Sequence, residues 1–147
     1  MANWDKRFID SAAFFAEWSK DRKRRIGAVI VSGRRIISTG FNGIPSGCDD
    51  NVETRHIKPA KLLYFEHAER NAIYAAAKAG ISPEGCTMYL TWFPCADCAR
   101  GIISVGIKKV VCYAPNWNDD TWGPTFLASK EMLEEAGVLI QYEGQVE

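Results

Sequence analysis

The chain has 147 residues, 47% hydrophobic and 24% charged, a composition that fits one soluble globular domain over residues 1–147. Its 18 basic and 18 acidic residues cancel, which argues against a protein that grips long nucleic acid. The longest aliphatic run, residues 28–31, is too short to cross a bilayer, and no signal-peptide apolar region follows Met1. We therefore expect a cytoplasmic protein that binds neither nucleic acid nor membranes.

The first half of the chain predicts a helix, a hairpin and a long loop. Asn3 can cap a helix in which apolar residues from Trp4 to Trp18 recur at three and four, and which should end near the basic run at residues 20–25. Strands at residues 26–31 and 35–39 are expected to pair antiparallel, because a glycine-containing turn separates them. Residues 40–56 are rich in turn residues, and a loop of this length in a compact domain is usually functional.

The second half alternates strands and helices. A strong, alanine-rich helix begins near His67 and stops at Gly80. Further helices are expected at residues 95–105 and 124–136, and strands at residues 88–91, 109–113 and 138–142. This alternation favours right-handed crossovers and parallel pairing. We predict a three-layer α/β/α fold in which helices cover both faces of a five-strand mixed sheet.

Two thiols stand three residues apart in Cys95-Ala-Asp-Cys98, directly after a proline. The chain has five cysteines, an odd set that in a reducing compartment is better explained by free thiols or metal ligands than by disulfides. His67 begins the strong helix and is the candidate third ligand. If the two helix N-termini meet on one side of the sheet, their partial positive charge stabilises thiolate.

Three ligands, His67, Cys95 and Cys98, leave a fourth coordination position for water, as a catalytic zinc requires. Glu69 lies two residues beyond His67, where its carboxylate could carry protons without binding the metal. His-x-Glu followed by Pro-Cys-x-x-Cys is the signature of zinc-dependent base deaminases. We therefore predict one catalytic Zn²⁺ per chain, with Glu69 as the catalytic residue.

Other interpretations of these residues stay open. A thioredoxin-like redox pair would leave the His-Ala-Glu helix start unexplained. A purely structural zinc needs a fourth ligand, which Cys48, Cys86 or Cys112 could supply, although Cys86 and Cys112 are more typical of small core residues. His56, in the polar loop, is interpreted as an ordinary exposed or loop-bonded histidine.

With this motif assembled, the chain resembles the cytidine deaminase superfamily, and within it most closely the deoxycytidylate (dCMP) deaminases. The resemblance covers nearly the whole chain and rests on five blocks: Ile26–Val31, Ser38–Gly47, His67–Ile73, Phe93–Cys98 and Gly106–Val110. It implies a cytidine deaminase-like fold and hydrolysis of dCMP to dUMP and ammonia. It also implies a homo-oligomer, commonly a hexamer, activated by dCTP with Mg²⁺ and inhibited by dTTP.

The resemblance suggests residues for the substrate as well. Asn42 matches a residue that hydrogen-bonds the sugar in related deaminases, and the backbone of Ala68 matches a contact to the pyrimidine. Lys23, Arg24 and Arg25, just before the first strand, are our candidates for a substrate phosphate, with a solvated basic face as the alternative. Trp117 is a candidate for the border of the base pocket.

The loop from Gly43 to Asp50 resembles the allosteric nucleotide region of the family. Gly43 and Gly47 permit close approach of backbone to phosphates, and Asp49 or Asp50 could contact Mg²⁺. A plain connecting turn is the alternative.

Three rival functions are also kept. A tRNA adenosine deaminase would share the same metal ligands, although zero net charge and the long loop argue against it. Another cytosine nucleotide, dCTP or CMP, could be the substrate. A zinc-stabilised binding module without catalysis would have no vacant coordination position and no need for Glu69.

Overall fold

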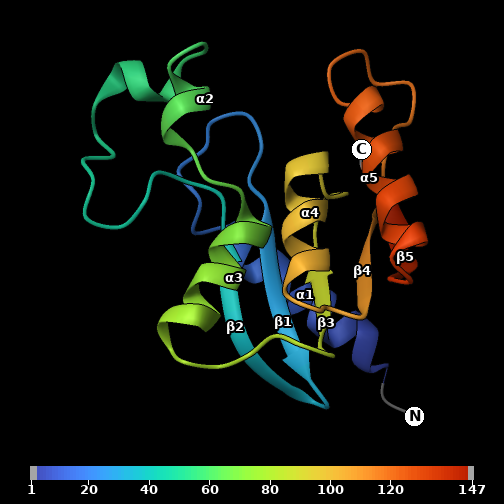
Figure 1. Cartoon of the computed structure of the whole chain (residues 1–147). Helices are drawn as coiled ribbons and strands as arrows, with labels where there is room; N and C mark the ends of the chain where they lie inside the picture. Colours follow the sequence, from blue (N-terminus) through green and yellow to red (C-terminus); the bar gives the residue numbers. More distant parts are fainter. Residues whose placement is uncertain (1–2, 146–147) are drawn as a thin grey trace.

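The computed structural model describes residues 3–145, which form a mixed five-stranded sheet between layers of helices (Figure 1). The elements in chain order are α1 (Trp4–Ala16), β1 (Gly27–Ser32), β2 (Arg35–Phe41), the 3-10 turn η1 (Glu53–His56), α2 (Lys61–Tyr64), α3 (Ala68–Lys78), β3 (Thr87–Leu90), α4 (Ala96–Ser104), β4 (Lys109–Ala114), α5 (Gly123–Glu135) and β5 (Leu139–Gln145). Within these residues, every helix is too short or too polar to cross a membrane.

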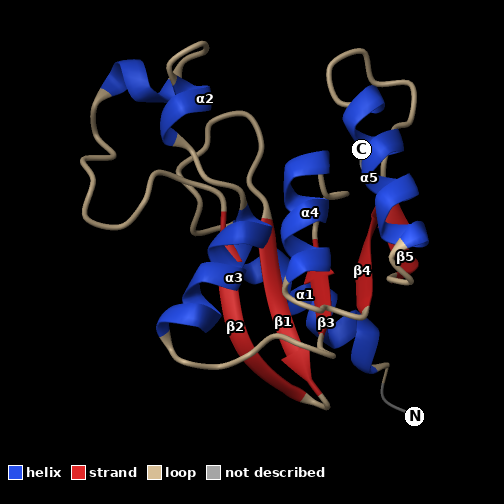
Figure 2. Ribbon diagram, in the orientation of Figure 1, coloured by secondary structure: helices blue, strands red, loops and turns tan. Residues whose placement is uncertain are grey.

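The strand order is β2-β1-β3-β4-β5. Strand β1 pairs antiparallel with β2 and with β3, whereas β3, β4 and β5 are parallel (Figure 2). The predicted hairpin and the predicted parallel second half are therefore both confirmed. Because β2 runs in the same direction as β3 and β4, the carboxyl ends of these strands meet at one edge of the sheet. The amino end of β1 lies at that edge too.

The two faces of the sheet pack against different helices. Along β3, Met88 and Leu90 belong to the core shared with α3, α4 and α5. Tyr89 points to the opposite face, where it packs with Val29 and with Phe8 of α1. Figure 1 shows α3 and α4 side by side in front of the sheet and α1 behind it. This is the predicted three-layer arrangement, with one helix on one face and three on the other.

Two glycines let helices approach the β1–β2 hairpin closely. A Cβ atom on Gly27 would lie 1.9 Å from the carbonyl oxygen of Ala12 in α1, and one on Gly40 would lie 2.4 Å from that of Ala68 in α3. No side chain larger than hydrogen fits between these backbones. Gly40 therefore sets how closely the N-terminus of α3 approaches the sheet.

Helix α1 begins as the sequence predicts and ends earlier than predicted. The side chain of Asn3 accepts a hydrogen bond from the backbone N–H of Lys6 at 3.0 Å. At the other end, the N–H groups of Glu17, Trp18 and Ser19 bond to carbonyls three residues back. These tighter turns end the α-helix at Ala16, before the basic run at residues 20–25 where the sequence predicts its end.

The two ends of the long loop after β2 pair with each other. Gly43 and Glu66 form an isolated antiparallel bridge, with N–H to O distances of 3.0 and 2.8 Å. Between them lie the short η1 and α2, which the sequence did not predict. The bridge places the end of the loop directly before His67.

Candidate metal and catalytic site

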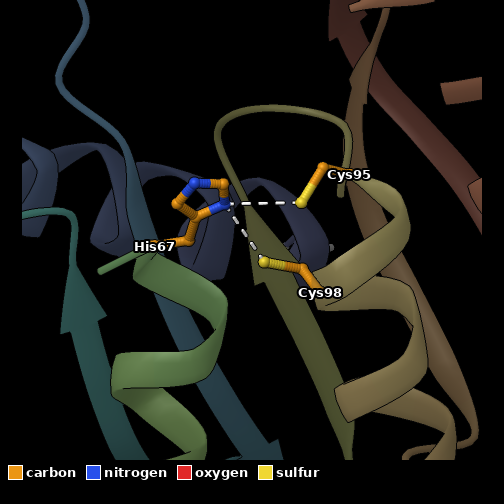
Figure 3. A group of neighbouring side chains, drawn as sticks. All are labelled: His67, Cys95 and Cys98. Atoms are coloured by element: carbon orange, nitrogen blue, oxygen red, sulfur yellow. Dashed lines mark hydrogen bonds between the residues drawn. The ribbon is translucent and has the colours of Figure 1, made fainter. Parts of the chain in front are cut away.

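The structure brings His67, Cys95 and Cys98 together where the N-termini of α3 and α4 meet (Figure 3). His67 directly precedes α3 and Cys95 directly precedes α4, while Cys98 lies in the first turn of α4. Nδ1 of His67 lies 3.4 Å from Sγ of Cys95 and 3.3 Å from Sγ of Cys98. Both helices start at the same sheet edge because each follows a strand whose carboxyl end lies there.

These three side chains fit a zinc ion. Their ligand atoms lie within 4.8 Å of one another, and within residues 3–145 they are the one group of this kind. One imidazole nitrogen and two sulfurs form the donor set that Zn²⁺ prefers. Cys48, Cys86 and Cys112 lie outside the group, as does His56, so the fourth ligand that a purely structural zinc needs is not among them.

The two thiols differ in how readily they lose their protons. A hydrogen bond from Cys98 lowers the pKa of Cys95 to about 4, although burial of Cys95 opposes the change. The pKa of Cys98 is raised because it holds the proton of that hydrogen bond and is itself buried. The hydrogen bond to Cys95 raises the pKa of His67. Zinc binding requires both thiolates and a neutral imidazole, and therefore releases the remaining protons.

Glu69 is a buried carboxyl beside this group. It lies in the first turn of α3 and is only 2% exposed. Burial raises the pKa of Glu69, and the nearby His67 opposes that rise. A carboxyl in such a place takes up a proton more readily than an exposed one, which suits a group that must both accept and release protons.

A cavity of about 280 Å³ joins these groups to the surface. Its wall is formed by the turn before β1, the start of the long loop, the segment from just before α2 to the first turn of α3, and residues before α4 and α5. The lining residues are Asp21, Lys23, Arg24, Ile26, Asn42, Lys58, Lys61, Leu62, Phe65, Glu66, His67, Glu69, Trp92, Cys95 and Trp122. A larger groove of about 590 Å³ runs along α1 and the end of β5 and contains no member of the metal-ligand group. The smaller cavity is therefore the candidate active site.

Most of the residues that the sequence suggested for the substrate lie at this cavity. Lys23, Arg24 and Asn42 line it, and Ala68 is fully buried between His67 and Glu69 in the sequence. Arg25 does not line it, because its side chain turns to Glu17, with which it pairs at 3.4 Å. Trp117 does not line it, contrary to expectation. Its ring packs on Phe93 at 5.2 Å between centroids.

Trp122 takes the place expected for Trp117. Its ring lies 6.3 Å from that of His67. The turn before α5 accounts for this placement, because Oδ1 of Asp119 accepts hydrogen bonds from the N–H groups of Thr121 and Trp122 at 2.9 and 2.8 Å. This side-chain-capped turn orients Trp122 toward the cavity.

Sequence reasoning missed several lining residues. Lys58 and Lys61 were not considered, although two lysines three apart shortly before the metal-binding helix were a usable signal. Trp92 lies next to the Phe-Pro-Cys motif, but the sequence assigns it no role. Asp21 lies within a basic run, and no sequence pattern indicates a role for it.

The four residues suggested for effector binding lie in the long loop, away from the cavity lining. The amide of Gly43 already donates to Glu66, and Gly47 has a φ of +93°. Oδ1 of Asp49 accepts from the N–H of Asn51 at 2.9 Å. Asp50 forms an ion pair with Lys20 at 2.9 Å.

Comparisons with known proteins agree with this chemistry. The family model of the cytidine and deoxycytidylate deaminase zinc-binding region matches residues 2–114. The chain is 42% identical over 147 residues to an uncharacterized deaminase of Aliivibrio fischeri, covering 97% of this chain and 95% of that protein. It is 39% identical over 122 residues to human deoxycytidylate deaminase, covering 79% of this chain and 67% of the human protein.

A solved structure is similar over almost the whole fold. The dCMP deaminase of the cyanophage S-TIM5, determined in complex with dCMP and dUMP, superposes with a TM-score of 0.76 at 27% identity. The match covers 93% of this chain and 94% of the phage enzyme. The chain belongs to the cytidine and deoxycytidylate deaminase family.

Proposed function

We propose that this protein hydrolyses dCMP to dUMP and ammonia and so supplies a precursor of thymidylate. The observation that carries the proposal is the three-ligand metal group beside buried Glu69, in a cavity with a basic rim. The similarity to the phage enzyme determined with dCMP and dUMP supports the choice of substrate.

His67, Cys95 and Cys98 would hold Zn²⁺, which when bound lowers the pKa of a water molecule toward about 7. The carboxylate of Glu69 would accept one proton from the attacking water and deliver it to the ring nitrogen, then accept the second from the resulting C4 hydroxyl and deliver it to the departing amine. The water oxygen would first add to C4 while the ring nitrogen is protonated, and the bond from C4 to the exocyclic nitrogen would then break as ammonia leaves. Burial of Glu69 keeps bulk water away from these transfers.

Cationic side chains on the cavity wall suit a monophosphate. Within residues 3–145, Lys23, Arg24 and Lys58 form no ion pair with a carboxylate, and all three line the cavity. The guanidinium of Arg24 lies 3.8 Å from the ring centroid of Trp92, which holds its plane in place. Lys61 differs, because it is paired with Asp21 at 2.8 Å. We assign the phosphate to the three unpaired cations.

The test is ammonia release from dCMP, CMP, dCTP and deoxycytidine, with adenosine in tRNA as a further substrate. We expect dCMP to be used far better than deoxycytidine, since each charge-assisted hydrogen bond to phosphate contributes roughly 1.5 to 3 kcal/mol. Equal efficiency on these two would contradict the phosphate assignment. Turnover of tRNA alone would favour the adenosine deaminase, and zinc binding without any turnover would favour a binding module.

On the basis of the same family resemblance, we also propose that effector nucleotides regulate the enzyme and that it assembles into an oligomer. dCTP with Mg²⁺ would activate and dTTP would inhibit at the loop from Gly43 to Asp50. The bridge between Gly43 and Glu66 supports this, because Glu66 accepts the backbone N–H of the ligand His67 at 2.9 Å. Effector phosphates would supply most Mg²⁺ ligands, so Asp49 or Asp50 need add only one or two oxygens.

A homo-oligomer, a hexamer by resemblance, is proposed as well. Large apolar side chains such as Phe14, Trp18, Leu62 and Leu63 are more than half exposed, which is typical of surfaces that associate. Light scattering of the purified protein would test this assembly. We propose the cytoplasm as its compartment, where the cysteines stay reduced.

A further inference from the structure

A buried aspartate lies where three parts of the cavity wall meet. Asp21 is 6% exposed and its carboxylate accepts hydrogen bonds from four residues. Oδ1 accepts from the backbone N–H groups of Lys23 at 2.8 Å and Arg24 at 3.1 Å. Nζ of Lys61 lies 3.0 Å from Oδ1 and 2.8 Å from Oδ2, and Nδ2 of Asn42 donates to Oδ2 at 3.1 Å.

Asn42 completes the attachment of the turn before β1. Its Oδ1 accepts from the N–H of Ile26 at 2.8 Å, and its Nδ2 also donates to the carbonyl of Arg24 at 2.9 Å. Both amide hydrogens are thus donated within the protein. A sugar hydroxyl could use only the second lone pair of Oδ1, so it would have to donate to Asn42.

Lys61 connects a distant segment to this turn. Its side chain is 15% exposed and reaches across 40 positions of sequence to Asp21. The segment that carries Lys61 also carries Lys58, and the turn held by Asp21 carries Lys23 and Arg24. One carboxylate therefore fixes the backbones that present all three unpaired cations of the cavity.

We propose that Asp21 is a positioning residue for phosphate recognition: it holds the turn of Lys23 and Arg24 against the segment of Lys58, and Lys61 acts through Asp21 and not on the phosphate. This inference rests on the proposed function. It separates four cations lining one cavity into three that contact the ligand and one that is structural. Asp21 takes no part in the proton transfers of Glu69. Its loss should therefore weaken binding of the phosphate and leave those transfers intact.

The experiment compares Lys61→Met and Asp21→Asn with the parent enzyme. Lys61→Met keeps the length and apolar stem of the side chain, and Asp21 retains its donors from Lys23, Arg24 and Asn42, so this variant should fold. Asp10→Asn is the matched control, because it removes an exposed Asp–Lys pair with Lys6 at 2.8 Å on α1. Zinc content, the kcat and KM for dCMP and for deoxycytidine, and hydrogen exchange of the Lys23 and Arg24 amides are measured.

We expect Lys61→Met to raise the KM for dCMP about tenfold or more, because the displaced turn and segment weaken about one charge-assisted contact that Lys23, Arg24 or Lys58 makes with the phosphate, with kcat and zinc content changed less than about twofold. Efficiency on deoxycytidine should stay at the parent value, as should all constants of Asp10→Asn. The amides of Lys23 and Arg24 should exchange at least about tenfold faster, because their acceptor is no longer fixed.

An unchanged KM for dCMP in folded Lys61→Met would overturn the inference, and so would an equal loss on dCMP and deoxycytidine, which a merely structural defect would give. Exchange provides a test that needs no substrate. If the parent enzyme does not turn over dCMP, the proposed function is wrong. Unaltered exchange at Lys23 and Arg24 in both variants would then reject the positioning role by itself.

Discussion

His67 and Cys95 occupy the same position on two neighbouring helices: each directly precedes the first turn, and Nδ1 of one lies 3.4 Å from Sγ of the other. Neither residue caps its helix with a side-chain hydrogen bond. The positive ends of both helix dipoles are therefore directed at the two donors, where they stabilise thiolate. Both helices thus lack the stabilisation of a side-chain cap, and the two side chains stay available to bind the metal.

The ligand set predicts the effect of removing one donor. Cys95→Ser and His67→Ala should each lower zinc well below one per chain and abolish deamination, because two remaining ligands hold zinc poorly. Cys48→Ser is the control, since Cys48 is exposed and lies outside the group. Elemental analysis after dialysis gives zinc per chain. Full zinc in either ligand variant would mean that another residue binds the metal.

Glu69→Gln separates metal binding from proton transfer. Glutamine has the same shape and fits the same buried site, but it cannot accept the proton from water. Zinc should stay near one per chain, while kcat should fall roughly 100-fold to 10,000-fold, the usual contribution of a general acid–base group. Glu131→Gln, at an exposed position on α5, is the control. Turnover that survives in Glu69→Gln would remove this residue from the mechanism.

The metal group was predictable because its signals are local. Each ligand stands at a helix start that the sequence marks, and the alternation of strands and helices sends those starts to one edge of the sheet. The rest of the cavity depends on contacts that no short pattern encodes. Lys61 meets Asp21 across 40 residues, from a segment with no clear periodicity.

The prediction of Trp117 at the cavity, where the structure has Trp122, failed for a similar reason. Both tryptophans lie in the connection between β4 and α5, and the sequence shows only that an aromatic residue follows β4. The direction of each ring depends on the turn at Asp119, whose side chain bonds to two later N–H groups. Such turn chemistry identifies a loop but does not place its side chains in space.

Gly27→Ala should destabilise the fold strongly. The new methyl group would lie 1.9 Å from the carbonyl oxygen of Ala12 and 2.6 Å from the amide nitrogen of Ala16, so α1 must move off the sheet. We expect a loss of about 3 kcal/mol or more in the free energy of unfolding, at the upper end of overpacking effects. Gly43→Ala is the control, because open space surrounds that position and its φ is not positive. Urea unfolding of both variants measures the difference, and equal midpoints would contradict the close approach.

Asp21 should make stability depend on acid. Burial pushes the pKa of Asp21 upward, but the hydrogen bonds from Lys61 and the N–H groups of Lys23 and Arg24 hold it below the ordinary 3.8. A carboxyl whose pKa is lower in the folded state contributes stability above the unfolded pKa and loses it as pH falls through the folded pKa. The parent should therefore lose more unfolding free energy between about pH 5 and about pH 3 than the double variant Asp21→Asn/Lys61→Met.

Zinc release on acidification affects both of these proteins, so the difference between them isolates the pair. Urea unfolding at each pH supplies the free energies. Identical losses in the parent and the double variant would show that Asp21 is protonated equally in the folded and unfolded chains.

Gly43→Val tests whether the long loop carries the effector response. Effectors change activity only if they bind one of two states of the loop or of a subunit interface more tightly than the other. The bridge from Gly43 to Glu66, and the bond from Glu66 to the N–H of His67, give the loop a direct connection to the metal group. A valine side chain would enter the open space beside Gly43, where an effector would need close access to the backbone.

We expect Gly43→Val to keep its zinc and its turnover of dCMP without effectors, while activation by dCTP and inhibition by dTTP both weaken. The measurement is a set of dCMP saturation curves for the two proteins with each effector in the presence of Mg²⁺. A mutant that responds as the parent does would exclude this loop as the effector site. A parent enzyme whose curves shift with neither nucleotide would show that the chain is unregulated, and that the turn from Gly43 to Asp50 serves only to connect β2 to the segment before α3.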